Sequence, residues 1–231
     1  METNKLLELE NKLGVHFKNQ DFLLEALTHR SYLNERPDWR INHNERLEFL
    51  GDAVLELAVT EYLFKNYSEP EGILTSWRAA LVNSTMLAEI SKKLDLNDYV
   101  LLSQGERKDP GRARQYILAN ALEALIGAIY LDQGYEETRQ FIEKYIIAEF
   151  PRIIDQKLYK DAKSLFQEEA QEREGATPSY KVLGEWGPDH SKTFKVGVYL
   201  NDELAGAGFG PSKQEAQQKA AEDALHKKKW K

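Results

Sequence analysis

The chain contains no cysteine among its 231 residues and only five histidines. The absence of cysteine excludes disulfide bonds and thiolate metal sites, and it is compatible with a reducing compartment. No segment reaches the ~20 consecutive apolar residues that a membrane-spanning helix needs. The first residues, METNKLLELENKLG, mix acids into an amphipathic pattern, which is unlike a secretory signal peptide. We therefore expect a soluble, cytoplasmic protein with no membrane partner.

An excess of positive charge is also missing, since the formal net charge is −7. Taken alone, this value argues against a polyanionic partner. The acidic excess lies in the first two thirds of the sequence, however, and the last third is close to neutral, with several lysines gathered near its end. The overall charge therefore neither supports nor excludes a nucleic-acid ligand.

Helical spacing dominates residues 1–150, where apolar residues recur at intervals of three and four. No convincing strand pattern occurs before residue 178. Loops are expected where polar, proline and glycine residues interrupt the helical spacing, at 13–21, 34–44, 66–72 and 105–114. The sequence therefore predicts an all-α domain over residues 1–155.

The pattern changes after a hinge expected near residues 156–160. A helix is predicted at 161–174, followed by the extended segments TPSYKVLGEWG, TFKVGVYLN and the glycine-rich ELAGAGFG. Helical spacing then returns, introduced by Ser212 and Glu215 in the arrangement of a capping box. Residues 160–231 are thus predicted to form a small α+β domain of order α-β-β-β-α.

Three acidic residues lie within one of the most apolar segments of the first domain, ERLEFLGDAVLEL. Glu45, Glu48 and Asp52 are spaced so that one face of a helix presents all three. Carboxylates that close repel one another unless a cation lies among them, and Mg²⁺ prefers oxygen ligands. The alternative is a polar strip along an otherwise buried helix, which Glu56 and Thr60 extend.

A second segment favours the metal site over the polar strip. ILANALEALIGAIYLD, residues 117–132, is apolar except for Asn120, Glu123 and its last residue. An isolated carboxylate in such a helix must be paired, protonated or metal-bound, because an uncompensated buried charge costs several kcal/mol. Two helices of this kind can face one another and share an ion.

These motifs resemble those of a known family. NERLEFLGDAVLEL resembles the signature motif of ribonuclease III, and ILANALEALIGAIYLD resembles the second catalytic helix of that family. The likeness extends to KLGVHFKNQDFLLEALTHRSY, to EGILTSWRAALVN and to the tail, which resembles a double-stranded-RNA-binding domain. The resemblance covers nearly the whole chain in family order. It implies an all-α endonuclease domain followed by a double-stranded-RNA-binding domain.

The resemblance also implies an activity. It is that of a homodimeric, Mg²⁺-dependent endonuclease that cleaves double-stranded RNA, of the type that processes rRNA and mRNA precursors. Each protomer would cut one strand, leaving 5′ phosphates and two-nucleotide 3′ overhangs. Two metal ions ~4 Å apart would activate water and stabilise the departing oxygen. Mn²⁺ is expected to substitute for Mg²⁺, and no organic cofactor is expected.

Site residues follow from the same resemblance. The matching positions are the metal ligands Glu48, Asp52, Asn120 and Glu123, the catalytic carboxylates Asp52, Glu123, Glu45 and Glu71, and the dimer contact Phe49. Glu45 and Glu71 correspond to acids that line the cleavage groove. His29, in LTHRSY, is expected to be a neutral histidine packed at a helix end and not a catalytic group.

Asn120 departs from the family pattern, which usually has Asp there. Asparagine keeps a carbonyl oxygen but removes one negative charge, so weaker Mg²⁺ binding is expected. The alternative is a catalytically weak or inactive RNase III-like protein that only binds double-stranded RNA. The other carboxylates are all present, which favours an active enzyme. A helical phosphohydrolase acting on small nucleotides is disfavoured by the scarcity of histidine and by the RNA-binding tail.

RNA contacts are expected from three surfaces of the tail. These are the first helix with Gln167, Glu168 and Gln171, the loop GPDHSK with His190, and the start of the last helix with Ser212 and Lys213. Gln214 and Gln217 replace lysines that are common in the family, which predicts weaker and less salt-dependent binding. The basic segment 105–114 is either a guide for RNA or a solvated connector.

Overall fold

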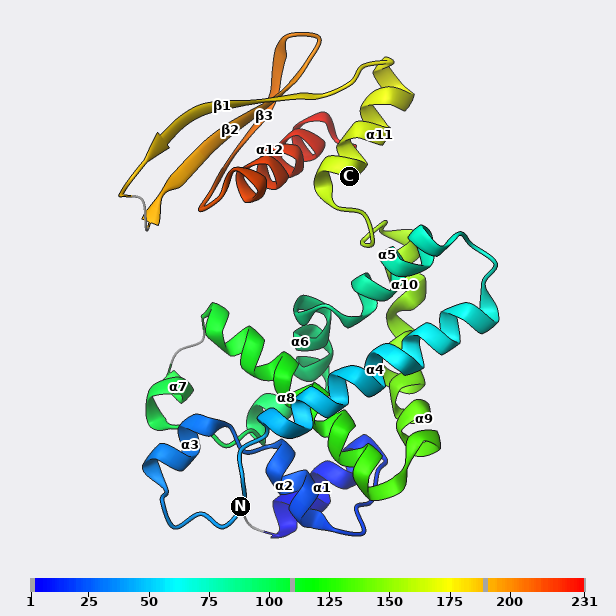
Figure 1. Cartoon of the computed structure of the whole chain (residues 1–231), viewed down its shortest axis with the longest axis vertical. Helices are drawn as coiled ribbons and strands as arrows, with labels where there is room; N and C mark the ends of the chain where they lie inside the picture. Colours follow the sequence, from blue (N-terminus) through cyan, green and yellow to red (C-terminus); the bar gives the residue numbers. More distant parts are fainter. Residues whose placement is uncertain (1–2, 109–110, 189–190, 231) are drawn as a thin grey trace. The chain divides into compact units, whose positions relative to one another are not determined.

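The computed structural model describes residues 3–108, 111–188 and 191–230 (Figure 1). The chain divides into two compact units, Met1–Tyr159 and Lys160–Lys231. Within the described ranges, no helix is both long enough and apolar enough to span a membrane.

The first unit is built from helices. Their bounds are α1 Thr3–Leu13, α2 Gln20–Ala26, α3 Arg30–Glu35, α4 Glu45–Asn66, α5 Glu71–Val82, α6 Ser84–Lys93, η1 Leu96–Asp98, α7 Gln104–Lys108, α8 Arg112–Gln133, α9 Tyr135–Tyr145, η2 Ile147–Glu149 and α10 Phe150–Asp155. Strand-like pairing is limited, in the described part of this unit, to an isolated parallel bridge between Thr28 and Leu101. The prediction of an all-α first domain is confirmed.

Two 22-residue helices, α4 and α8, pack against each other at the centre of this unit (Figure 1). Every residue from Ile117 to Ile129 is buried except Asn120 and Glu123, which are partly exposed. Within this central stretch of α8, the two polar residues therefore lie where its otherwise complete burial is interrupted.

Two glycines set the distance between α4 and α8. A Cβ atom added to Gly51 would lie 1.8 Å from the carbonyl oxygen of Glu123, and one added to Gly127 would lie 2.3 Å from the carbonyl oxygen of Leu47. No side chain fits at either position, so only glycine permits this backbone-to-backbone approach. The crossing places the residues next to Gly51 opposite those next to Glu123.

The prediction of a loop over residues 105–114 is wrong for most of that segment. Residues up to Lys108 belong to α7, and α8 begins at Arg112, while residues 109–110 lie outside the described residues. Hydrogen bonds hold α7: Ser103 Oγ accepts from the Glu106 amide at 3.2 Å, and Arg114 Nη2 donates to the Glu106 carbonyl oxygen at 2.7 Å. The contact with Arg114 depends on the packing of α8, which composition does not reveal.

The second unit is a three-stranded antiparallel sheet with two helices. Its elements are α11 Ala162–Glu174, β1 Ser179–Trp186, β2 Thr193–Leu200, β3 Glu203–Gly210 and α12 Lys213–Lys228, with the strands in the order β1-β2-β3. Buried Val196 and Val198 face this unit's core, which includes Phe166 and the alanines of α12. A Cβ atom on Gly208 would lie 2.3 Å from the Ala220 nitrogen, so α12 lies directly on β3. The predicted α-β-β-β-α order is confirmed.

Candidate active site

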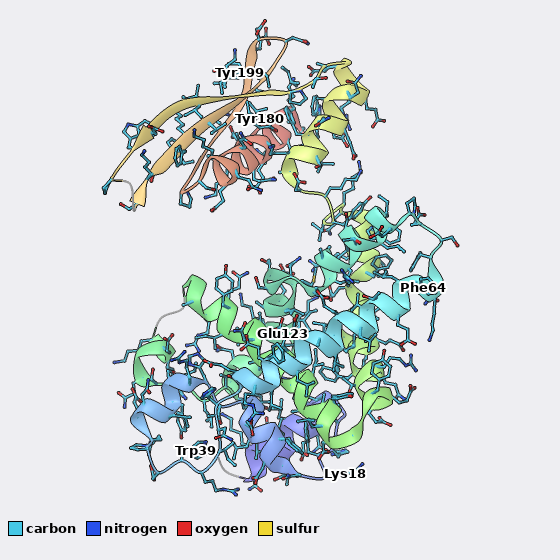
Figure 2. All side chains as sticks on the ribbon, viewed as in Figure 1. Lys18, Trp39, Phe64, Glu123, Tyr180 and Tyr199 are labelled. Atoms are coloured by element: carbon cyan, nitrogen blue, oxygen red, sulfur yellow. The ribbon has the colours of Figure 1, made fainter. Side chains whose placement is uncertain are left out.

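The crossing of α4 and α8 brings four polar side chains together. Glu48 and Asp52 lie one turn apart on α4, and Asn120 and Glu123 lie one turn apart on α8. Figure 2 labels Glu123 in the middle of the helical unit, where these two helices meet. The four residues that the sequence predicts as metal ligands therefore form one cluster.

Burial and neighbouring carboxylates raise the pKa values of Glu48 and Glu123. The pKa of Glu123 is raised to about 8, first by burial and then by the charges of Asp52 and Glu48. Burial also raises the pKa of Glu48, together with the charges of Glu45 and Asp52. A hydrogen bond from Asn120 to Glu48 opposes this rise. Among the described residues, no lysine, arginine or histidine lowers the pKa of Glu48 or Glu123. The repulsion between the carboxylates of the cluster is therefore not offset by a cationic side chain.

The chemistry of this cluster fits a hard divalent cation. Carboxylate and amide oxygens are the ligands that Mg²⁺ takes, and a cation among them would relieve the repulsion that raises the pKa of Glu123. In the described ranges, no three His, Cys, Asp or Glu side chains are already arranged so that they could hold a metal ion. The fourth residue of the cluster is Asn120. Its side-chain NH₂ group donates a hydrogen bond to Glu48, so its side-chain oxygen can bind a cation.

Glu45 borders the cluster, whereas Glu71 does not. Glu45 begins α4, and its carboxylate lies 3.3 Å from Arg30 Nη1 and 3.8 Å from His43 Nδ1. Glu71 begins α5 and lines a hollow of about 410 Å³ with residues from the second half of α4, including Thr60. Thr60 lies about 12 Å along α4 from Asp52, at 1.5 Å per residue. Within one chain, Glu71 is therefore separate from the other acids.

An apolar strip runs along the outside of α4. Phe49, Leu57 and Phe64 are 82%, 57% and 78% exposed, and their spacing places them on one side of the helix. Beside Phe49 lies a hollow of about 690 Å³, lined in part by Leu50 and Leu131. Apolar side chains exposed in a row on a long helix are typical of a surface that another protein covers.

His29 lies at the start of α3, outside the acidic cluster. Its Nδ1 accepts a hydrogen bond from the Ser31 amide at 3.3 Å and lies 2.8 Å from Ser31 Oγ. Burial lowers the pKa of this half-buried imidazole, so it is neutral at pH 7. The prediction of a neutral histidine at a helix end is confirmed.

Apart from His190, the residues predicted to contact RNA lie on α11 and at the start of α12. Gln167, Glu168 and Gln171 are exposed, and Glu168 forms an ion pair with Lys160. His190 lies outside the described residues.

Ser212 caps α12 by accepting a hydrogen bond from the Glu215 amide at 3.1 Å. Lys213 follows it and is exposed, with its Nζ 5.8 Å from the centre of the Phe194 ring. The lysine is therefore available to a ligand, while the serine hydroxyl already holds the first turn of the helix.

Gln217 has a role that sequence reasoning missed. Its Oε1 accepts a hydrogen bond from Lys163 Nζ at 2.7 Å, so a lysine of α11 lies beside this position. A lysine at position 217 would repel Lys163, which explains why an amide is suitable here. Nothing in the sequence indicates this pair, because the two residues are 54 positions apart. The glycine pair of the helix crossing was also missed, although each glycine interrupts an apolar helix close to a predicted ligand.

Comparison with known proteins gives matches for both units. Residues 19–150 match the family model described as Ribonuclease-III-like, and residues 162–228 match the double-stranded RNA binding motif. Ribonuclease 3 of Nitratiruptor sp. is 46% identical over 96% of this chain and 96% of its own length. Ribonuclease 3 of Natranaerobius thermophilus is also 46% identical, over 98% of this chain and 97% of its own length.

A solved structure agrees with these relatives. The nuclease domain of ribonuclease III from Campylobacter jejuni is 43% identical, has a TM-score of 0.56 and covers 62% of this chain and 97% of its own. The resemblance found in the motifs is confirmed, and with matches that span both units the chain belongs to the ribonuclease III family.

Proposed function

We propose that the chain is a Mg²⁺-dependent endonuclease that hydrolyses double-stranded RNA at the cluster formed by α4 and α8. Family membership and the double-stranded RNA binding motif support the reaction class and the substrate class. The observation that carries the metal dependence is the uncompensated cluster itself, in which burial and neighbouring carboxylates raise the pKa of Glu123 to about 8. Mn²⁺ is proposed to substitute for Mg²⁺.

In this proposal Glu48, Asp52, Asn120 and Glu123 hold the cation. Bound Mg²⁺ supplies activation of water and stabilisation of the charge that develops on the leaving oxygen. Glu123 gives up its proton when a cation is present, because a carboxylate must be deprotonated to bind one. Asn120 orients Glu48 through its amide. The crossing at Gly51 fixes the distance between the two pairs.

Glu45 and Glu71 are proposed to line the cleavage groove and to position the scissile strand. Arg30 contacts the Glu45 carboxylate and so limits its movement at the edge of the cluster. We infer that the products carry 5′ phosphates and two-nucleotide 3′ overhangs, and that the substrates are cytoplasmic precursors of rRNA and mRNA.

We further propose that the protein is a homodimer that pairs through the apolar strip of α4. Phe49 is the predicted contact, and its 82% exposure supports this assignment. The nuclease domain of the Campylobacter jejuni protein is described as flexible in a region that is involved in dimer formation. The separation of Glu71 from the other acids of its own chain is compatible with a groove that two chains form together.

Duplex binding is assigned to the two helices of the second unit and to the segment GPDHSK. Gln167, Glu168 and Gln171 are proposed to contact 2′-hydroxyls of one minor groove and His190 those of the next. Ser212 and Lys213 are proposed to meet phosphates at the start of α12, where the helix dipole favours negative charge.

The test is a Mg²⁺ titration of cleavage on a long RNA duplex. Asn120→Asp restores a negative charge, and we expect the Mg²⁺ concentration for half-maximal rate to fall about tenfold, because each added charge strengthens cation binding. Glu123→Gln keeps the size of the side chain but removes the charge, and we expect the rate to fall about a hundredfold or more. Glu137→Gln, at an exposed position of α9, is the matched control and should cleave normally.

The catalytic proposal fails if the native chain binds the duplex but leaves it intact at every Mg²⁺ and Mn²⁺ concentration. The protein would then be an RNase III-like RNA-binding protein. Equal rates for the native chain and Glu123→Gln would instead show that cleavage occurs at another site.

A further inference from the structure

Among the described residues of the second unit, no element of that unit covers one face of its sheet. The register pairs Val196 with Gly208 and Val198 with Gly206, and these residues face α12. Residues that alternate with them point the other way. We call the opposite side the open face; it carries Lys181, Leu183, Trp186, Lys195, Tyr199, Leu204 and Phe209. In Figure 2, Tyr199 lies on the side of the sheet away from α12, and Tyr180 lies toward the helices.

The open face exposes large apolar rings. Trp186 and Phe209 are 53% and 51% exposed, and their ring centres are 6.3 Å apart with an angle of 34° between the planes. Leu183 and Leu204 are 42% and 54% exposed and lie on either side of Gly197. Such a group of exposed apolar side chains on a small domain indicates a surface that binds a ligand.

The charges of the open face have one sign. Lys181 Nζ lies 4.8 Å from the centre of the Tyr199 ring, and Lys195 Nζ lies 5.2 Å from that of Phe209. Neither lysine forms an ion pair within the described part of the chain. The register places the two acids of the strands, Glu185 and Glu203, opposite Phe194 and Leu200 on the other face. Among the described strand residues, the open face is therefore aromatic and basic and carries no acid, although the whole chain has a net charge of −7.

We propose that the open face binds single-stranded RNA. Bases stack on aromatic rings whatever their sequence, and lysines beside the rings meet the phosphates, which is the combination that single-strand-binding surfaces use. An antiparallel sheet with helices on its other face supports this mode of binding in other RNA-binding domains. Each eight-residue strand is about 26 Å long, which suits a short site of ~4 nucleotides.

Charge argues against a second copy of the chain as the occupant of the open face. In a two-fold contact the same patch meets itself, so Lys181 and Lys195 would approach the lysines of the other copy without an acid to pair with. An RNA strand supplies the negative charge that this surface lacks. Two of the proposed duplex contacts, Gln167 and Lys213, belong to helices that pack on the opposite face of the sheet. The choice of RNA rests on the proposed function, whereas the binding site itself requires no cleavage.

The test measures the binding of a fluorescent ten-nucleotide CU-repeat RNA, which forms no Watson–Crick duplex, to the full-length chain in EDTA. We expect Trp186→Ala to weaken binding at least about fivefold, the lower limit for loss of one base–aromatic stack. Trp186→Phe should restore most of the affinity, since it keeps a ring. Lys181→Ala combined with Lys195→Ala should weaken binding and flatten its salt dependence, while Lys18→Ala, at an exposed loop of the first unit, should change nothing.

Duplex binding and cleavage in Mg²⁺ are measured on the same variants with a blunt-ended duplex and should be unchanged. Failure of the proposed function would remove cleavage from every variant and leave the single-strand result intact. The proposal is overturned if Trp186→Ala binds the CU-repeat RNA as well as the native chain does. It is equally overturned if Lys213→Ala alone abolishes that binding. Sedimentation that shows Trp186→Ala to be less self-associated than the native chain would also overturn it, because the open face would then bind a second copy of the chain.

Discussion

Burial and two neighbouring carboxylates all raise the pKa of Glu123. This residue could be identified as a site residue from the sequence. A lone acid in a run of buried residues has few ways to satisfy its charge, so its isolation already pointed to a partner. The same reasoning identified Asn120. It could not find the bond between Lys163 and Gln217, because neither residue interrupts a pattern and only the packing of α11 on α12 brings them together.

The raised pKa of Glu123 makes stability depend on pH. Its folded value of about 8 exceeds the ordinary value of 4.5, so the folded chain binds an additional proton between these pH values. Stability of the helical unit therefore falls as pH rises from about 5 to 8. In EDTA we expect Glu123→Gln to remove the part of this decline that Glu123 causes, and to be more stable than the native chain at pH 8 by about 1–3 kcal/mol after allowing for solvent screening.

Urea unfolding at several pH values, followed by circular dichroism, measures this difference. Saturating Mg²⁺ should abolish the decline in the native chain, since cation binding removes the repulsion. Parallel pH profiles for the native chain and Glu123→Gln would show that Glu123 titrates normally in the folded protein.

Helices α4 and α8 illustrate what periodic patterns reveal and what they leave out. Spacing and apolar content predicted that both are helical and that each carries ligands. The crossing point was not predictable, because a glycine in a helix indicates a close approach only after its partner is known. The short helix α7 was missed for a related reason, because residues outside it supply two of its hydrogen bonds. Ser103 Oγ accepts from the Glu106 amide, and Arg114 donates to the Glu106 carbonyl oxygen.

Replacement of a crossing glycine should be costly. Gly51→Ala places a methyl group 1.8 Å from the carbonyl oxygen of Glu123, and we expect a loss of about 3 kcal/mol or more, the upper range for overpacking. Gly72→Ala is the matched control, because nothing lies within 4 Å of its added Cβ and α5 should gain slightly from alanine. Thermal unfolding of both variants measures the difference. A Gly51→Ala chain as stable as the native one would show that α4 and α8 are less tightly apposed.

For the whole molecule, the change from helical to alternating spacing correctly predicted a helical unit followed by an α-β-β-β-α unit. Composition contributed little, since a net charge of −7 gave no sign of an acid-free surface on the second unit. That surface depends on strand register, and β1 and β3 each contain an irregularity in pairing that shifts which residues share a face. Register of this kind is decided by the assembled sheet.

Dimerisation is the property of the whole molecule that the α4 strip predicts. We expect the native chain to sediment as a dimer and Phe49→Glu to sediment as a monomer with at least about tenfold lower cleavage, because a charge in an apolar contact is not compensated. Leu7→Glu, at a 45% exposed position of α1, is the matched control and should remain dimeric. A fully active monomeric Phe49→Glu chain would contradict the proposed dimer.

The contact of Gly51 with the backbone of Glu123 also limits how this enzyme can evolve. Every replacement of Gly51 adds atoms where the opposite helix already lies, so the distance between the two helices at the proposed metal site is fixed. The charge of the site is not fixed in this way, because an exchange between aspartate and asparagine at position 120 alters no backbone contact. A lineage that meets a different supply of divalent ions can therefore adapt through the identity of its ligands, while the frame that holds them stays the same.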